Sequence, residues 1–478
     1  MTKVIIIGGV AGGSKTAAKL KHLKPDYDIT IYTKEQYVSY SACGFPFYIG
    51  GSIRDLDKLI IRTIDEFEGK GIHVKNFHEV LQILPNKKKV LIKNLKEDTE
   101  FYEDYDKLVI ATGAEPFIPK ISGTDIEYVY TLRNMVDARN IKKRLLESEN
   151  ALIIGGNYIG VELMESFIKQ SVTTTIVEAN THLMKFYDKD ISKIIQENIK
   201  IIQPTYTNII TSDTVTTLKK ADEKIEVFTK KGKHFYTDMV VIAAGVKPCV
   251  NLAKDAGIEI GKTGAIKVDN KMRTSIEDIW AVGDCVEKFN IVSGEWEYIP
   301  LGSTANKEGR VCALNIAGFE DEVFEGVLAS SVVKYFDYSM SKTGLSEVRA
   351  RAVGYDVVSV LLTTLDKSKY MPDVKSITIK LLADKKTRKV LGVQSVGFGD
   401  ADKRVNVLTM ALLKGSTIDE FVNTDITYAP AVSTSIDPIL TAAHILIDKL
   451  SNWFYFSLGC PTNFTNNLIT FGIWQTNE

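Results

Sequence analysis

A single cysteine, Cys43, stands in the stretch from Ser39 to Gly51 and is followed directly by Gly44. We predict that a helix starts at this point. Backbone N–H groups and the helix dipole at such a start favour a thiolate and lower the pKa of a thiol. The alternative is an unreactive buried cysteine, the commoner state of a cysteine without such surroundings. Nucleotide-binding patterns on both sides of the stretch favour a reactive thiol at Cys43.

The residues before Cys43 have the pattern that opens a dinucleotide-binding fold. An apolar strand at residues 3–7 leads into the glycine-rich loop 8–13 and then a helical segment. Glycines permit the tight turn, and N–H groups at the helix start bind a pyrophosphate. The next strand, 28–33, ends at Thr33, where an acidic ribose ligand is expected, so we expect weaker ribose binding or a role for Glu35.

The same pattern returns later in the chain. Strand 151–154, loop 155–160 and strand 173–177 predict a second dinucleotide site, with Glu178 at the strand tip. A carboxylate there accepts both ribose hydroxyls and repels a 2′-phosphate, which favours NADH over NADPH. Asn157 departs from the pattern, because it adds a side chain where the middle glycine is expected.

Two further segments complete the duplication. The strand and glycine turn at 108–116 recur at 240–248, which indicates two related nucleotide domains. A later strand, 279–285, carries Asp284, whose carboxylate can accept hydrogen bonds from a sugar-like chain. The predicted fold is α/β, with two Rossmann-like dinucleotide-binding domains and a C-terminal α+β domain. For that last domain we predict strands at 331–336, 357–362, 376–382 and 390–396, then helices at 403–414 and 417–422.

The composition excludes several classes of function. A net charge of −1 over 478 residues, without blocks of like charge, argues against nucleic acid or an anionic membrane as the main partner. The five cysteines have neither a C-x-x-C nor a zinc-type spacing. We therefore expect no metal site and a reducing, cytoplasmic location. We find no export signal and no apolar run near the about 20 residues that span a bilayer.

Taken in order, these motifs resemble the FAD-dependent pyridine nucleotide-disulfide oxidoreductases, in the branch with a single redox cysteine that includes coenzyme A-disulfide reductases and NADH oxidases. The resemblance implies an FAD-binding domain at 1–117 and 246–325, an NAD(H)-binding domain at 118–245 and a dimerisation domain at 326–450. Residues 451–478 are an atypical C-terminal extension beyond the resemblance.

The resemblance also implies site residues. Those expected at FAD are Gly8, Val10, Ala11, Gly12, Gly13, Thr33, Lys34, Ala111, Thr112, Gly113, Gly283, Asp284, Gly302, Thr304 and Ala305. Those expected in the nicotinamide nucleotide domain are Gly155, Asn157, Tyr158, Ile159, Gly160, Glu162, Glu178 and Gly245. In the family pattern Tyr158 gates the nicotinamide pocket and Glu162 orients the carboxamide.

Two further groups of residues concern the substrate. Lys15, Lys19 and His22 lie at i, i+4 and i+7 and form one basic helix face. The family's coenzyme A contacts occupy these positions together with Ser39 and Ala42, although a solvated face explains the charges equally well. Tyr370 and Tyr428 match two catalytic tyrosines that a homodimer presents across its interface, and a phenol suits a proton donor to a departing thiolate.

The implied reaction uses NADH, with NADPH as an alternative, and FAD to reduce coenzyme A disulfide through Cys43. Polysulfide or persulfide reduction stays open. One rival is an NADH oxidase that reduces O₂ through a cysteine sulfenic acid. A non-enzyme rival is a degenerate flavoprotein with a binding or regulatory role. Four departures from the family pattern motivate that rival, namely Thr33, Tyr40, Ala42 and Asn157.

Overall fold

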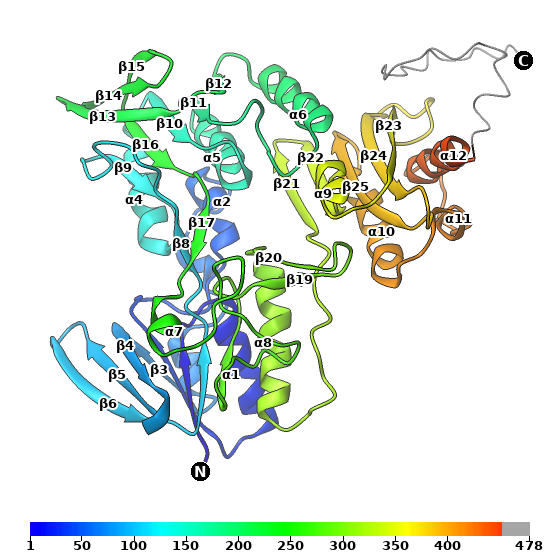
Figure 1. Ribbon diagram of the computed structural model, residues 1–478. Coiled ribbons are helices and arrows are strands. Elements are labelled where there is room, and N and C mark those ends of the chain that lie inside the picture. Colours follow the sequence, from blue (N-terminus) through cyan, green and yellow to red (C-terminus); the bar gives the residue numbers. More distant parts are fainter. Residues whose placement is uncertain (452–478) are drawn as a thin grey trace, which may run out of the picture. The chain divides into compact units, whose positions relative to one another are not determined.

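The computed structural model describes residues 1–451, so all but the first residue of the extension at 451–478, with Cys460, lies outside the described residues. Two compact units make up the chain (Figure 1). The first contains Met1–Thr181, Gln203–Asn290 and Gly294–Val327, and the second contains His182–Ile202, Ile291–Ser293 and, within the described residues, 328–451.

The first unit contains a parallel five-stranded sheet with the order β18-β7-β1-β2-β3. The expected strands at 3–7 and 28–33 are confirmed with the same bounds. The sheet is formed by β1 (Lys3–Ile7), β2 (Asp28–Thr33), β3 (Ile72–Asn76), β7 (Lys107–Ile110) and β18 (Ile279–Ala281). Helices α1 (Ala11–Leu23) and α8 (Gly302–Ile316) pack against each other, as Figure 1 shows.

A second parallel sheet in the same unit has the order β12-β11-β10-β16-β9. Its strands are β9 (Val129–Thr131), β10 (Asn150–Ile154), β11 (Thr173–Glu178), β12 (Thr207–Thr211) and β16 (Met239–Ile242). Helix α5 (Tyr158–Lys169) follows β10 as α1 follows β1. Two Rossmann-like sheets are therefore present, as the sequence predicts.

Close backbone packing repeats in the two copies. A Cβ added at Gly8 would lie 2.2 Å from the Ala111 carbonyl oxygen, and one added at Gly155 would lie 2.5 Å from that of Ala243. Both glycines have positive φ, at 105° and 109°. Only glycine fits such a conformation without strain, so the duplication extends to the packing of individual residues.

Smaller elements complete the first unit. Antiparallel sheets are formed by β4 (His78–Leu84), β5 (Lys89–Asn94) and β6 (Thr99–Asp104), by β13 (Val215–Ala221), β14 (Lys224–Thr229) and β15 (His234–Thr237), by β8 (Ala114–Pro116) with β17 (Val246–Pro248), and by β19 (Lys288–Asn290) with β20 (Glu295–Glu297). The remaining helices are α2 (Phe45–Ile49), α3 (Ile64–Glu68), α4 (Met135–Leu145) and α7 (Asn251–Asp255).

The second unit is an antiparallel sheet of order β21-β22-β25-β24-β23 with helices packed on it. The strands are β21 (Ser331–Tyr335), β22 (Tyr338–Gly344), β23 (Val357–Leu365), β24 (Ser376–Asp384) and β25 (Val390–Gly397). The helices are α6 (Lys189–Ile202), α9 (Glu347–Ala352), α10 (Ala401–Lys414), α11 (Ile418–Phe421) and α12 (Pro438–Leu450). The α+β character expected for this part is confirmed.

The sequence did not predict β22, because its residues are mostly small and polar. Ser339, Ser341 and Thr343 are nevertheless buried, since β22 pairs with a strand on each side. The Ser341 hydroxyl donates to the Ser331 carbonyl oxygen at 3.3 Å, which satisfies a buried polar group within the sheet. No helix among residues 1–451 is both long and apolar enough to cross a lipid bilayer.

Candidate active site

Cys43 lies in a single 3₁₀ turn, Ala42–Gly44, directly before α2. Gly44 is required there, because a Cβ would lie 2.3 Å from the Leu59 side chain. Its N–H donates to the Ser41 carbonyl oxygen at 3.0 Å and closes the turn. Cys43 itself is exposed. The turn therefore places Cys43 at the surface of the first unit, directly before the following helix, with its thiol partly desolvated.

The expected lowering of the Cys43 pKa is wrong. Partial desolvation of the thiol raises its pKa, and the carboxylates of Glu162 and Asp284 raise it further. A backbone hydrogen bond and the Arg133 guanidinium oppose this rise without reversing it. The two carboxylates belong to segments far from Cys43 in the sequence, so the local helix-start argument did not include them.

Glu162, in the first half of α5, is a titratable neighbour of Cys43. Burial raises the pKa of its carboxyl to about 7, with a smaller contribution from Glu165. The carboxyl is therefore partly protonated at neutral pH. Because the Glu162 carboxylate also raises the pKa of Cys43, after the larger effect of desolvation, its protonation should favour ionisation of the thiol.

The first glycine loop has the packing that a bound dinucleotide needs. A Cβ at Gly13 would lie 1.9 Å from the Gly8 carbonyl oxygen, and one at Gly12 would lie 2.9 Å from the Val282 side chain. The first-turn N–H groups of α1 lie at this loop, with Val10, Ala11 and the two glycines. A surface without side chains beside a helix N-terminus fits the pyrophosphate of FAD.

The side chains at the end of β2, where a ribose ligand is expected, make contacts within the protein. The Thr33 hydroxyl oxygen accepts a hydrogen bond from the Glu35 N–H at 3.2 Å, while Lys34 forms an ion pair with Glu79 at 3.2 Å. The Tyr40 hydroxyl donates to the Glu35 carboxylate at 2.5 Å. Burial raises the pKa of Glu35. The ribose-binding role considered for Glu35 stays a prediction.

The remaining residues expected at FAD lie in turns and at the start of α8. Gly113 and Gly283 have φ values of 71° and 85°, and the Thr112 hydroxyl donates to the Cys249 carbonyl oxygen at 2.8 Å. Gly302, Thr304 and Ala305 lie in the first turn of α8, with the last two buried. Ala111, Thr112 and Gly113 follow β7 directly.

Arg133 is a residue of this region that the sequence analysis did not identify. Its guanidinium lies 3.5 Å from the Asp284 carboxylate, and a Cβ on Gly113 would lie 2.9 Å from the same group. The Arg133 backbone N–H donates to Asp137 at 2.8 Å, within the capping box that starts α4 at Asn134. The Asn-x-x-Asp spacing was a usable signal for the helix start, but not for the position of the arginine.

The second glycine loop holds Glu178 in place. Its buried carboxylate accepts from the Gly156 N–H at 2.7 Å and from the Asn180 N–H at 2.8 Å. Asn157 is the N-cap of α5, with φ −95° and ψ −161°, an extended conformation that any residue adopts. The missing middle glycine therefore does not strain the loop. Tyr158, Ile159 and Gly160 form the first turn of α5, and Gly245 has φ 122°.

A cavity of about 540 Å³ gathers the basic residues of α1. Lys15, Lys19 and His22 line it together, which confirms the predicted basic face. The sequence analysis missed three more cations in the lining, which is formed by Lys15, Ala18, Lys19, Lys21, His22, Arg62, Lys70 and Ile72. Of the other two positions expected at coenzyme A, Ser39 is buried with φ 49°, and Ala42 lies in the Cys43 turn. Neither lines this cavity.

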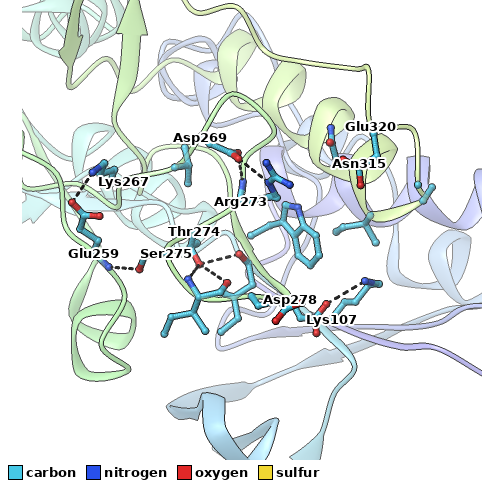
Figure 2. Close-up of a pocket in the computed structure, with 18 of the residues that line it drawn as sticks. Lys107, Glu259, Lys267, Asp269, Arg273, Thr274, Ser275, Asp278, Asn315 and Glu320 are labelled. Carbon is cyan, nitrogen blue, oxygen red and sulfur yellow. Dashed lines mark hydrogen bonds and ion pairs between the residues drawn. The ribbon is translucent and has the colours of Figure 1, made fainter.

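A larger cavity of about 960 Å³ lies elsewhere in the first unit and contains none of the expected site residues. Figure 2 shows that several of its charged groups are paired with one another. Lys267 contacts Glu259 at 2.6 Å, Arg273 contacts Asp269 at 2.7 Å, and Lys107 contacts Asp278 at 3.4 Å. Such paired charges offer little attraction to a charged ligand, so the basic cavity is the better candidate for substrate.

In the second unit, Tyr370 and Tyr428 are exposed, with 70% and 50% of their surface accessible. Tyr370 follows β23 and Tyr428 follows α11. Both residues are therefore accessible to a second molecule.

Comparison with known proteins agrees with this geometry. Residues 2–309 match the family model described as pyridine nucleotide-disulphide oxidoreductase, and residues 330–438 match its dimerisation domain. The chain is 34% identical over 448 residues to the NAD(P)H coenzyme A polysulfide/persulfide reductase of Pyrococcus horikoshii, covering 93% of this chain and 98% of that protein.

Other relatives carry related names. The NADH oxidase of Methanocaldococcus jannaschii is 35% identical, covering 94% of this chain and all of that protein. The coenzyme A disulfide reductase of Staphylococcus haemolyticus is 28% identical, covering 91% and 96%. The solved structure of reduced Bacillus anthracis CoADR-RHD has a TM-score of 0.91 and 31% identity, covering 94% of this chain and 81% of that one. The chain belongs to the pyridine nucleotide-disulphide oxidoreductase family.

Proposed function

We propose that this FAD-dependent oxidoreductase reduces coenzyme A disulfide, or a related coenzyme A persulfide, with Cys43 as the nucleophile. The observation that carries the proposal is the cavity lined by Lys15, Lys19, His22 and Arg62 in the unit that also holds Cys43. Coenzyme A carries several phosphate charges, and clustered cations are the side chains that bind them.

In the proposed reaction, the Cys43 thiolate attacks one sulfur of the substrate disulfide. A new S–S bond forms between Cys43 and one coenzyme A, and the other leaves as a thiolate that takes up a proton. Phenols of the partner subunit's Tyr370 and the partner subunit's Tyr428 are the proposed proton donors. FAD, when bound, supplies the two-electron link between NAD(P)H and this protein–substrate disulfide.

We also propose a preference for NADH over NADPH. Glu178 is buried and fixed at the second glycine loop by the Gly156 and Asn180 N–H groups. A carboxylate held at this point suits two ribose hydroxyls and repels a 2′-phosphate. In this proposal, Tyr158 gates the nicotinamide and Glu162 orients its carboxamide.

The proposed assembly is a homodimer, and it rests on the dimerisation domain at residues 330–438. The second unit carries an exposed apolar row on α10, formed by Val407, Met410 and Leu413. Burying such a row in a symmetric interface would remove it from water. The division into an FAD-binding domain (1–117 and 246–325), an NAD(H)-binding domain (118–245) and a dimerisation domain (326–450) remains part of this proposal.

The proposed location is the cytoplasm. Four cysteines in the described residues are free thiols, namely Cys43, Cys249, Cys285 and Cys312. Free thiols are typical of proteins in a reducing compartment.

The deciding experiment is NADH consumption by the purified, FAD-loaded protein without oxygen, with and without coenzyme A disulfide, followed by readmission of air. We expect turnover that needs coenzyme A disulfide and is lost in Cys43→Ser. Cys249→Ser is the matched control, since Cys249 is only partly buried and is not the proposed nucleophile. Turnover that Cys43→Ser leaves intact would refute the proposal.

NADH oxidation by O₂ is the second candidate, favoured by the exposure of Cys43 and by the relative from M. jannaschii. Rapid turnover in air alone would support it. Val10 stands where oxidases and peroxidases of the single-cysteine branch usually carry a histidine. The lack of that histidine disfavours peroxide reduction. Absence of flavin bleaching by NADH in a folded, FAD-loaded protein would instead support the degenerate flavoprotein, which Ala42 and Thr33 motivate.

A further inference from the structure

A fully buried ion pair lies beside the turn that carries Asp284. Lys288 on β19 and Glu308 on α8 have 0% and 1% exposed side chains, and their charged groups are 3.5 Å apart. Both belong to the first unit. The proposed mechanism gives neither residue a role.

Both side chains hold the same backbone residue, Gly283. The Glu308 carboxylate accepts the Gly283 N–H at 2.7 Å, and the Lys288 ammonium donates to the Gly283 carbonyl oxygen at 2.6 Å. A second bond from Lys288 to the Val286 carbonyl oxygen, at 2.9 Å, closes the turn. Hydrogen bonds to charged groups are stronger than neutral ones, so the conformation of Gly283 is firmly fixed.

Fixing Gly283, which has φ 85°, also fixes the direction of the next residue, Asp284. The turn lies close to the first glycine loop, because a Cβ on Gly12 would be 3.5 Å from the Gly283 nitrogen. Glu308 lies next to a second close approach to the same loop. Its neighbour Gly309 approaches Gly12 so closely that a Cβ would lie 2.6 Å from the Gly12 carbonyl oxygen.

Stability alone does not explain the pair. Apolar side chains of similar size often replace a buried ion pair without loss of stability, because desolvation offsets the attraction between the charges. Apolar side chains, however, could not bond the two backbone groups of Gly283. What Lys288 and Glu308 provide, and apolar side chains could not, is therefore a fixed position of the turn.

We propose that Lys288 and Glu308 are positioning residues for FAD, which preset the Gly283–Asp284 turn against the first glycine loop before the cofactor binds. This inference rests on the proposed assignment of Asp284 as an FAD contact. The pair limits the loss of backbone freedom when FAD binds, and preorganisation of that kind increases affinity.

The test is the affinity of the FAD-depleted full-length protein for FAD, measured by titration together with thermal stability. In Lys288→Met/Glu308→Met both charges are removed together, but the backbone groups of Gly283 lose their partners. We therefore expect lower thermal stability and an FAD dissociation constant raised by about tenfold or more. If the double variant binds FAD within twofold of wild type, the pair is merely structural and the proposal fails.

A control separates general destabilisation from positioning. Lys380 is also a buried, paired lysine, 2.8 Å from Asp190 and 3.1 Å from Glu347, but it lies in the second unit. Lys380→Met should lower thermal stability and leave the FAD dissociation constant unchanged. An equal loss of FAD affinity in Lys380→Met would contradict a specific role for Lys288 and Glu308.

Hydrogen exchange on the wild-type protein gives a readout that needs no variant. We expect the Gly283 amide to exchange slowly with and without FAD, since its acceptor is Glu308. Protection that appears only with FAD would refute a preset turn. Asp284→Ala tests the underlying assignment separately. Unchanged FAD affinity in that variant would remove Asp284 as a contact and the inference with it, whereas the proposed disulfide chemistry would still be judged by Cys43→Ser.

Discussion

The ionisation of Cys43 depends on charged residues far away in the sequence. Desolvation is the largest cause of the raised thiol pKa. The carboxylates of Glu162 and Asp284 raise the pKa further, and the Arg133 guanidinium opposes them. The thiol therefore ionises less readily than a free cysteine, and a change in the surrounding charges shifts its pKa. Glu162 is the group whose charge changes near neutral pH, because burial raises the pKa of its carboxyl to about 7.

Glu162→Gln should lower the pKa of the Cys43 thiol. Above about pH 7 the wild-type carboxylate is charged and raises the thiol pKa, so its removal should speed alkylation of Cys43 about threefold or more. Below about pH 6 Glu162 is already neutral, and the two proteins should react alike. The measurement is the iodoacetamide reaction rate as a function of pH.

Glu165→Gln is the matched control on the same helix, because Glu165 forms an ion pair with Lys169 at 2.5 Å. Its effect should be clearly smaller. A rate increase in Glu162→Gln that is the same at pH 5.5 and pH 8 would contradict titration of Glu162 as the cause.

Sequence reasoning identified the proposed nucleophile at this scale but not its surroundings. Cys43 was identifiable from its position between nucleotide motifs. Arg133, Arg62 and Lys70 were not, because each lies in a turn or loop whose path depends on tertiary packing. The local argument for a low thiol pKa failed for the same reason, since it considered one turn and no distant carboxylate.

At the scale of elements, the basic face of α1 is the feature with the clearest consequence for substrate binding. Lys15 and Lys19 are one helical turn apart, and loop residues Arg62 and Lys70 complete the lining of the same cavity. Because cations from separate elements converge on one cavity, a bound polyanion explains their arrangement better than a solvated helix face does.

Lys19→Ala should raise the KM for coenzyme A disulfide about tenfold, the loss expected for one charge-assisted contact, and should leave the KM for NADH unchanged. Arg62→Ala should behave in the same way. Lys24→Ala is the control, because Lys24 caps the same helix but does not line the cavity. Equal KM values in all three variants and wild type would show that the basic face is only solvated. Steady-state kinetics at two ionic strengths provide the measurement.

The elements that depend on local pattern were predictable. Strand, glycine loop and helix were placed correctly in both copies because the sequence shows the apolar runs of the buried strands and the glycines that adopt positive φ in the loops. Strand β22 was not, since its buried serines and threonine are satisfied only by neighbouring strands. In such a strand the burial comes from tertiary pairing, and no hydrophobic period marks it.

At the scale of the whole molecule, the proposed dimer should depend on the exposed apolar row of α10. Met410→Glu places a charge on a side chain that is 60% exposed in the single chain. We expect a monomer, because burying an unpaired carboxylate in an interface costs more than the contact gains. Light scattering with size-exclusion chromatography measures the mass. We expect the monomeric variant to reduce disulfide more slowly while it still binds FAD.

Val348→Glu serves as the control for that change. Val348 is 72% exposed on α9, outside the α10 row. The variant should keep the mass and activity of the wild type. A Met410→Glu protein that remains dimeric and fully active would show that α10 lies outside the interface.

Strand β8 (Ala114–Pro116) pairs antiparallel with β17 (Val246–Pro248). In the sequence, β8 precedes all strands of the second parallel sheet and β17 follows them. The chain thus leaves the first sheet and returns to it at a single hydrogen-bonded junction. A segment whose two ends are adjacent can be exchanged as a cassette without altering the strands that precede or follow it. We expect that replacing residues 117–245 by the corresponding segment of a relative would alter the choice of electron donor, provided that Arg133 and Glu162, which act on Cys43, and Asp190, which pairs with Lys380, are kept.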